Sequence, residues 1–422
     1  MIYRFLRWYT RWGIKFFYRN VFIFHKKKID FNKSAILASN HPAGFYESII
    51  LTTILPKPVH FLVRSDYVNI KFLKRFFKVI KLLPIYRQSE GIRDVKKNNE
   101  VFDIISVELK NNSFIGIYPE GTTKYQFKVS PIKKGISRII LNAMEESIDP
   151  IRVVPVGFNF SDLTKFRSFL NIYSDGEIDF TKDDLSSRNK NMDLRKMTNK
   201  IENRLFEVNI NIEDLEKQHL YKKVQYLLIN EALAKSRVHS YDRKSSLPEK
   251  LVKLSQEINK LEKPRFEKFN FMVNQYFNRL KSLKINDFAV VSKKVTIINF
   301  MSLVFGFPVF LFGVLANVFP VLPGIFIVKK FTKQQEYKTA LLVLISQVFY
   351  FIYFVVLLIL SFVFFHAMGL VVTVLPFLAW YSVKYYDLLS DVFYSFKFKF
   401  AKENKIIREE RNEILKYLPI VF

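Results

Sequence analysis

The 422-residue chain has no cysteine, and its 38 Asp and Glu residues are far outnumbered by 66 Lys and Arg residues. Without cysteine there are no disulfides, no thiolate metal sites and no cysteine nucleophile. Glycine is scarce, at 12 residues, and no glycine-rich phosphate loop occurs, so nucleotide hydrolysis is not expected. The six histidines show no metal-ligand spacing, and we predict no metal site. The net charge of +28 indicates an anionic partner, either nucleic acid or an anionic membrane surface.

Two long uncharged runs favour the membrane, and no nucleic-acid-binding motif is recognisable. Residues 295–328 and 339–383 contain no Lys, Arg, Asp or Glu. A membrane-spanning helix needs about 20 apolar residues. The second run is long enough for two spans with a break near residues 366–369. The first run is compatible with a tight hairpin, a re-entrant pair or one kinked span, because it is interrupted by Pro308, Asn317, Pro320 and Pro323.

Lysines flank both runs. They precede the first run, fill the gap between the runs and follow the second run: Lys293, Lys294, Lys329, Lys330, Lys333, Lys338, Lys384, Lys397 and Lys399. Because basic loops stay on the cytoplasmic side of a membrane, both runs are expected to enter and leave on the same side. We therefore predict transmembrane hairpins within residues 295–390, followed by a basic C-terminal tail of residues 391–422.

Residues 1–29 are predicted to contain an N-terminal amphipathic interfacial helix. Basic residues recur at three- and four-residue intervals, which puts them on one helix face: Arg4, Arg7, Arg11, Lys15 and Arg19. Aromatic residues such as Trp8, Trp12 and Phe16 cover the remainder. This pattern is typical of a helix in the membrane interface, with its basic side toward headgroups and its aromatic side toward acyl chains. The alternative is a soluble helix whose aromatic residues pack on the neighbouring domain.

Residues 30–215 alternate short apolar runs typical of strands with longer segments of helical period. The expected strands are residues 35–38, 59–63, 114–117, 153–156 and 171–173, and the expected helices are residues 70–80, 95–109 and 136–146. Such alternation predicts an α/β domain. Residues 216–294 are polar, rich in Lys and helical in pattern, which predicts a basic helical connector before the all-α C-terminal transmembrane region.

Four short blocks stand out; the first and third follow predicted strands, and the fourth overlaps one. The first block is residues 40–47, the second 84–87, the third 118–122 and the fourth 154–157; they read NHPAGFYE, PIYR, YPEGT and VPVG. The first block carries His41 and, six residues on, Glu47. Imidazole suits a general base at neutral pH, and a carboxylate on its other ring nitrogen fixes the tautomer and stabilises the imidazolium. Residues six apart do not share a helix face, so His41 is expected in the loop before the helix.

In order and rough spacing, these blocks resemble those of the glycerolipid O-acyltransferases, the superfamily of glycerol-3-phosphate, lysophosphatidate and lysophospholipid acyltransferases. The resemblance covers residues 30–215 and implies a mixed sheet covered by helices. Residues 131–135 are similar to a proline-leucine-lysine-x-glycine stretch in a subset of the family. Two positions depart from the family pattern. Glu47 lies six residues after His41, whereas the family has an Asp five residues after its histidine. The third block of the family usually continues with Arg or Ser, whereas this chain continues with Thr123 and Lys124.

The resemblance also implies roles for individual residues. His41 is expected to act as the general base and Glu47 as its orienting partner. Substrate binding is expected of residues from the second and third blocks and of one lysine beyond them: Arg87, Glu120, Gly121, Thr122 and Lys124. Arg87 is the first candidate for the acceptor's phosphate, because a guanidinium binds phosphate with two parallel hydrogen bonds. Lys133 and Arg64 are candidate assistants.

Alternatives remain open for the roles of Glu120 and Glu47 and for the identity of the oxyanion donors. Glu120 is expected either to bind the acceptor's hydroxyl or to order its loop. The oxyanion donors are expected among backbone amides near Gly44 or Gly121. Glu47 in place of Asp raises a rival hypothesis, in which the chain is a weakly active membrane lipid-binding protein.

The function implied by the resemblance is that of a membrane-bound acyltransferase in phospholipid synthesis. It would transfer a fatty acyl group from acyl-CoA or acyl-carrier protein to a hydroxyl of glycerol 3-phosphate or a lysophospholipid, without a cofactor. Another lipid hydroxyl, such as that of a lyso-aminolipid, is the alternative acceptor. Membrane lipids are the expected partners, and no nucleic acid is expected. The expected location is the cytoplasmic (inner) membrane, with several spans and the catalytic domain on the cytoplasmic side.

Overall fold

The computed structural model describes residues 1–27, 29–68, 74–86, 97–146, 150–185, 189–235, 241–292 and 295–418. Within these ranges the strands form one sheet in the order β4-β3-β5-β2-β6-β7-β1-β9, and β8 pairs with β6. The strands are β1 (Asn20–His25), β2 (Ala35–Ser39), β3 (Val59–Arg64), β4 (Leu82–Ile85), β5 (Phe114–Ile117), β6 (Ile151–Phe160), β7 (Phe169–Ser174), β8 (Ile178–Phe180) and β9 (Tyr241–Asp242).

The sheet is mixed, as expected. Strand β2 lies between β5 and β6 and is parallel to both, with Ala38 opposite Ile117 and Ser39 opposite Val156. Strands β3 and β4 continue the parallel part, whereas β7 and β8 run antiparallel to β6. Because the carboxyl ends of parallel neighbours lie at one edge, the ends of β2, β3, β4 and β5 meet there. This edge carries the first and third blocks and the described residues of the second block, 84–86.

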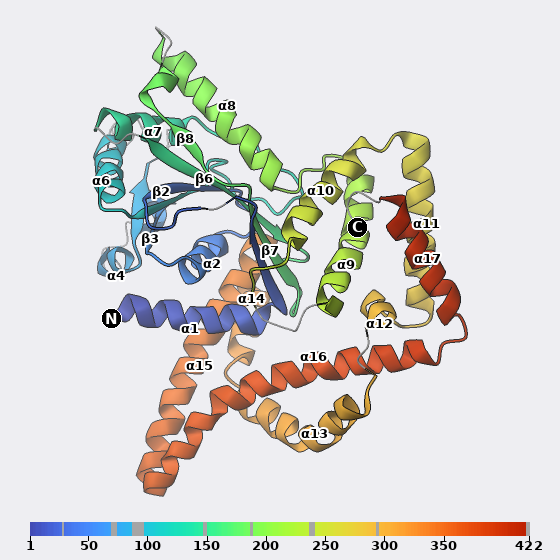
Figure 1. Cartoon of the computed structure of the whole chain (residues 1–422). Coiled ribbons are helices and arrows are strands. Elements are labelled where there is room, and N and C mark those ends of the chain that lie inside the picture. Colours follow the sequence, from blue (N-terminus) through green and yellow to red (C-terminus); the bar gives the residue numbers. More distant parts are fainter. Residues whose placement is uncertain are drawn as a thin grey trace.

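Helices cover both faces of the sheet, so β2 is buried on both sides (Figure 1). Successive strand residues point to opposite faces. Accordingly, Ala35 and Leu37 pack in one core with α1 (Ile2–Phe17) and α2 (Tyr46–Ile54), and Ile36 and Ala38 pack in another. The second core includes residues of α6 (Asn98–Lys110), α7 (Gly135–Glu145) and α8 (Lys190–Val208). Two faces covered by helices explain why the strands read as continuous apolar runs. The short helices α3 (Ser65–Val68) and α4 (Lys74–Val79) lie between β3 and β4, and the 3-10 segment η3 (Lys182–Leu185) lies between β8 and α8.

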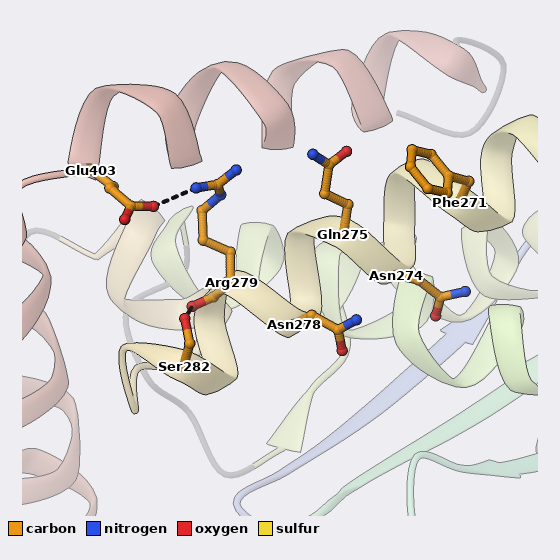
Figure 2. A pocket seen from close by; sticks show the side chains of 7 residues that line it. All are labelled: Phe271, Asn274, Gln275, Asn278, Arg279, Ser282 and Glu403. Atoms are coloured by element: carbon orange, nitrogen blue, oxygen red, sulfur yellow. Dashed lines mark hydrogen bonds and ion pairs between the residues drawn. The ribbon is translucent and has the colours of Figure 1, made fainter.

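A separate helical core follows the sheet. It joins α9 (Leu215–Lys235), α10 (Leu247–Lys260), α11 (Lys263–Ser282) and α12 (Asp287–Val291) with α17 (Asn404–Tyr417) near the end of the chain. Figure 2 shows the seam between α11 and α17, where Arg279 pairs with Glu403. The seam is an open concavity lined by Phe271, Asn274, Gln275, Asn278, Arg279, Ser282 and Glu403. Six of these residues belong to α11, and Glu403 directly precedes α17, whereas the four blocks lie in the sheet region.

The C-terminal region holds two long apolar helices. They are α13 (Ile297–Val318) and α15 (Gln335–Phe365), which by length and composition can cross a membrane. Helix α14 (Leu322–Phe331) returns along α15, and its ten residues span about 15 Å, which is too short for a full crossing. Helix α15 ends where the break was expected, at the 3-10 segment η4 (His366–Val374), and α16 (Leu375–Lys399) returns beside α13 (Figure 1).

The structure adds detail to the expected division at both ends of the chain. Within residues 1–29 the helix spans Ile2–Phe17, and residues 20–25 form the unexpected strand β1, which pairs with β7. Residues 391–422 are not a simple tail. Helix α16 continues to Lys399, and Ile407 and Ile414 of α17 are buried in the helical core. Of the helix expected at 70–80, residues 69–73 lie outside the described ranges.

The surroundings of α1 also differ from the expected interfacial arrangement. The rings of Trp12 and Phe16 pack edge-to-face against Trp380 of α16, and Tyr9 packs against Phe351 of α15. The aromatic side of α1 is therefore largely covered by the apolar helices. On the basic side, the guanidinium of Arg7 donates to backbone carbonyls at the end of α2. Only the first turns of α1 leave large side chains such as Phe5 and Trp8 exposed.

Candidate active site

His41 and Glu47 lie side by side at the carboxyl end of β2. His41 follows the strand in a short loop, and Glu47 stands in the first turn of α2. The Nδ1 atom of His41 lies 3.5 Å from Oε2 of Glu47, and the side chains are 17% and 0% exposed. Among the described residues, neither atom has a hydrogen-bond partner. The two groups are thus in ion-pair range, at a distance longer than a strong hydrogen bond.

The loop between the two residues is folded back on itself. The backbone N–H of Ala43 donates to Oε1 of Glu47, which holds the carboxylate against the loop. Gly44 has a φ of +68°, in the left-handed region that favours glycine. This bend turns the chain into α2 and brings a carboxylate six residues from the histidine back beside the imidazole. The fold thereby accommodates the longer spacing of this chain.

Tyr118 of the third block stacks on the imidazole of His41. Their ring centroids are 4.1 Å apart with an interplanar angle of 14°, and the Tyr118 hydroxyl lies 2.7 Å from Oγ of Ser48. Burial raises the pKa of the Tyr118 hydroxyl well above its ordinary value, so the phenol stays neutral. No sequence pattern predicts a role for Tyr118. Because β5 pairs with β2, the residue directly after β5 lies beside His41, and this strand pairing is the signal that could have identified Tyr118.

Glu120 joins the first and third blocks. Its Oε1 accepts a hydrogen bond from the backbone N–H of His41 (3.1 Å), and its Oε2 accepts one from the backbone N–H of Ser130 (3.0 Å). Burial raises the pKa of this carboxyl, and the two hydrogen bonds oppose the shift. Of the two roles considered for Glu120, these contacts are those of loop ordering. A second link joins the same loops, because the N–H of Lys124 donates to the carbonyl of His41 (3.2 Å).

The residues around Gly121 form the exposed side of the third block. Gly121 has a φ of +66°, and a Cβ added there would lie 2.9 Å from Nζ of Lys133. The ammonium of Lys133 therefore lies over the turn at Gly121, and the side chains of Thr122 and Lys124 are exposed. The N–H of Gly121 donates to the carbonyl of Tyr118 (3.0 Å). This amide already has an acceptor within the turn, which makes it a poor candidate for an oxyanion donor.

The fourth block supports the first from the other side of β2. The side-chain amide of Asn40 accepts from the N–H of Phe158 (2.8 Å) and donates to its carbonyl (2.9 Å). Gly157 meets the end of α8 so closely that an added Cβ would lie 2.0 Å from the carbonyl oxygen of Val208. Asn40 and Gly157 thus hold the strand end beneath His41, and neither role was predicted from the sequence.

Two candidate arginines and the question of a metal site remain. Arg87 lies outside the described residues. Arg64, at the end of β3, forms an ion pair with Asp66, so its guanidinium is already engaged. Within the described part of the chain, no group of three or more His, Asp or Glu side chains could hold a metal ion. The described site therefore consists of a histidine, its carboxylate, a stacked tyrosine and nearby lysines.

The region that carries the blocks is similar to known acyltransferases. Residues 21–159 match the family model Acyltransferase. A 1-acyl-sn-glycerol-3-phosphate acyltransferase of Bacillus subtilis (strain 168) is 25% identical over 114 residues, which are 27% of this chain and 52% of that protein. The match thus spans about half the length of this curated relative. The crystal structure of the 1-acyl-sn-glycerophosphate (LPA) acyltransferase PlsC from Thermotoga maritima is 13% identical, with a TM-score of 0.35, over 47% of this chain and 76% of that chain.

Proposed function

We propose that this chain acylates a glycerolipid hydroxyl at a membrane. Its residues 21–159 match the Acyltransferase family model, and it is distantly similar to a 1-acyl-sn-glycerol-3-phosphate acyltransferase. The observation that carries the proposal is the pairing of His41 with the buried Glu47. Tyr118 and Glu120 of the third block support this pair from the neighbouring strand. The donor is a fatty acyl thioester, either acyl-CoA or acyl-carrier protein.

In this mechanism His41 is the general base. Since Nδ1 faces Glu47, Nε2 is the ring nitrogen that accepts the proton from the acceptor's hydroxyl as its oxygen attacks the thioester carbonyl. The carbon–sulfur bond then breaks, and His41 passes the proton to the departing sulfur, which leaves as the thiol and returns the imidazole to its neutral form. Glu47 stabilises the imidazolium formed in between and fixes the neutral tautomer. The ring stack with Tyr118 limits rotation of the imidazole.

The acceptor is proposed to be glycerol 3-phosphate or a lysophospholipid. Lys133 lies over Gly121, and Lys124 is exposed next to the first block, so two cations are available to a phosphate. Arg87 is proposed as a third, on the basis of its place in the second block. Glu120, Gly121 and Thr122 are proposed to shape the turn past which the acceptor binds. Charge-assisted hydrogen bonds from such groups each contribute about 1.5–3 kcal/mol.

The protein is proposed to reside in the cytoplasmic membrane, with the sheet on the cytoplasmic side. Helix α15 is the proposed membrane crossing, and α13 and α14 are proposed to form a re-entrant pair, because α14 is too short to return a chain that has crossed fully. Lysines gather where α14 ends and α15 begins. The absence of cysteine makes this directly testable. Single cysteines at Lys333 and at Thr373 should be labelled by an impermeant maleimide only from opposite sides of the membrane. Labelling of both from the same side would contradict the proposed topology.

The test of function is an assay of the purified protein with a panel of acceptors and labelled acyl donors. The panel includes glycerol 3-phosphate, lysophosphatidate, other lysophospholipids and a lyso-aminolipid, each with acyl-CoA and with acyl-carrier protein. We expect a product with a phosphorylated acceptor that is lost in the His41→Ala protein. No transfer to any lipid hydroxyl would contradict the proposal and favour a lipid-binding role. Transfer only to acceptors without phosphate would leave the reaction type intact but contradict the acceptor.

A further inference from the structure

Helix α15 begins inside the α/β half of the molecule. The hydroxyl of Thr339 donates to the carbonyl of Leu163, and Ala340 and Val343 are buried in the same core as Tyr46 of α2. The later turns of α15 expose apolar residues instead. In Figure 1 this helix leaves the sheet region beside α1 and extends away from it. Its first turns are therefore part of the domain that carries His41.

Tyr337, in the first turn of α15, lies against the bend of the first block. A Cβ added at Gly44 would lie 2.6 Å from Cδ1 of Tyr337 and 3.5 Å from the carbonyl oxygen of Glu336. The ring of Tyr337 is also in contact range of the ring of Phe45, with centroids 6.3 Å apart. Gly44 is the residue whose positive φ turns the chain between His41 and Glu47. The aromatic ring thus covers the hinge of the catalytic pair.

Glu336, the neighbour of Tyr337, holds the other loop of the site. Its Oε1 accepts a hydrogen bond from the backbone N–H of Tyr125 (3.1 Å). The preceding residue, Lys124, donates its N–H to the carbonyl of His41. Two consecutive residues of one helical turn therefore contact both loops that form the site, one by packing and one by a hydrogen bond.

We propose that Glu336 and Tyr337 are positioning residues for the His41–Glu47 pair, so that a helix from the C-terminal region completes the active site. Neither side chain is placed at the reacting atoms; Tyr337 acts through Gly44, and Glu336 acts through Tyr125. Catalytic groups displaced by about 1 Å can lose about 100-fold in rate. The sheet and the four blocks alone would then be a poor catalyst, and a change in the seating of α15 would alter the rate. The kinetic part of this inference rests on the proposed acyl transfer.

The first experiment compares Tyr337→Ala with Tyr337→Phe in the full-length protein. We expect the alanine variant to lower kcat by about 10- to 100-fold while KM for donor and acceptor changes less than about threefold. The phenylalanine variant keeps the ring and should stay within about twofold of the parent. Tyr353→Ala is the matched control, because this tyrosine lies on the same helix but donates to the carbonyl of Ala316. A kcat unchanged in Tyr337→Ala, or lowered equally in Tyr353→Ala, would overturn the proposal.

A second readout does not depend on turnover. Diethyl pyrocarbonate modifies accessible imidazoles, and mass spectrometry gives the rate at His41 alone. We expect modification of His41 to be severalfold faster in Tyr337→Ala than in the parent, and unchanged in Tyr337→Phe and Tyr353→Ala. If the parent shows no acyl transfer, the proposed function fails while this rate still tests the contact. Equal rates in the parent and Tyr337→Ala would show that the ring does not control the loop.

A double-mutant cycle isolates the contact with Gly44. In the parent, Gly44→Ala places a methyl group against the ring of Tyr337 and also strains a positive φ; in Tyr337→Ala only the strain remains. The loss of kcat on Gly44→Ala should therefore be about tenfold smaller in the Tyr337→Ala background. For the second contact, Glu336→Ala should lower kcat by about tenfold, and Glu336→Gln, which keeps an acceptor for Tyr125, should restore most of it. Additive losses in the cycle, or equal losses in the two Glu336 variants, would overturn the inference.

Discussion

The sheet region and the helices α13 to α16 place apolar and polar groups in opposite ways. In the sheet region the strands are buried, and two of the buried polar groups there, Glu47 and Glu120, belong to the candidate site. In α13 and α15 large apolar side chains such as Phe305 and Phe364 are exposed. Buried polar groups instead join these helices to one another, as where the Tyr350 hydroxyl donates to Asn317 (2.7 Å). This inversion is expected when one region faces water and the other faces lipid.

The two regions are joined by a buried charged contact. The guanidinium of Arg167, in the loop between β6 and β7, pairs with Asp387 of α16, and both side chains are nearly buried. Arg167 also donates to the backbone carbonyls of Phe16 (2.9 Å) and Tyr18 (2.8 Å) at the end of α1. The helix terminus carries unpaired carbonyls that a cation satisfies well. One arginine thus ties the sheet, α1 and the membrane-type helices together.

The largest expected effect is a loss of turnover without a loss of membrane association. His41→Ala should lower kcat by about 100- to 10,000-fold, because it removes the general base. Membrane association and thermal stability should be unchanged, since α13 and α15 are untouched. Turnover and membrane fractionation measure the two properties in the same preparation. Activity within a few-fold of the parent would remove His41 from the mechanism.

The second largest expected effect concerns stability and the ion pair between Arg167 and Asp387, which joins the two regions. Asp387→Ala leaves the guanidinium of Arg167 buried without its carboxylate, and such losses cost about 3–5 kcal/mol of stability. Denaturant unfolding followed by tryptophan fluorescence measures the change. The control is Glu145→Ala, which breaks an exposed pair with Lys190 and should cost at most about 1 kcal/mol. Equal effects would mean that the two regions are joined mainly by apolar packing.

The departure of this chain from the family pattern gives a smaller and more specific effect. Glu47→Gln removes the charge that stabilises the imidazolium, whereas Glu47→Asp keeps the charge on a shorter arm. We expect the Gln variant to lose about tenfold more kcat than the Asp variant, by analogy with triad carboxylates. Steady-state kinetics of both variants measure this. A Gln variant as active as the parent would show that Glu47 only holds the N–H of Ala43 at the start of α2.

Sequence patterns predicted the central strands for a physical reason. An apolar run that ends in a polar block marks the carboxyl end of a buried parallel strand, as at Ala38 and Ile117. Strand β1 was missed because residues 20–25 follow the amphipathic pattern of α1 without a turn signal. Its four buried residues, from Asn20 to Ile23, show that it is an internal strand.

The supports of the site were not predictable in the same way. Tyr337 contacts Gly44 across nearly 300 positions, and nothing in the composition of α15 marks its first turn as part of the site. Arg167 and Asp387 are likewise far apart in sequence, and each resembles an ordinary surface charge. Local periodicity reports which face of an element is buried, but it does not report which distant element covers that face. These contacts required the arrangement in space.

The smallest expected effect concerns Glu120, the buried carboxylate that joins the blocks. Burial raises its pKa, so the folded protein holds this proton more tightly than the unfolded chain does. The titration of Glu120 therefore favours folding at pH values below the ordinary carboxyl pKa, and this contribution is lost as the pH rises through the raised folded value.

Glu120→Gln tests this linkage, because glutamine does not titrate and keeps only one oxygen for the N–H groups of His41 and Ser130. The Gln variant should be less stable than the parent, and the difference in Tm should be larger at pH 4 than at pH 7. Other carboxyl groups titrate in both proteins and cancel in the difference. A Tm difference that grows toward pH 7 would mean that the two amide hydrogen bonds outweigh burial and favour the charged form. The N–H groups of His41 and Ser130 would then stabilise the Glu120 carboxylate as water does at a surface. In that case the buried polar groups of the sheet region would be as well solvated by hydrogen bonds as exposed ones.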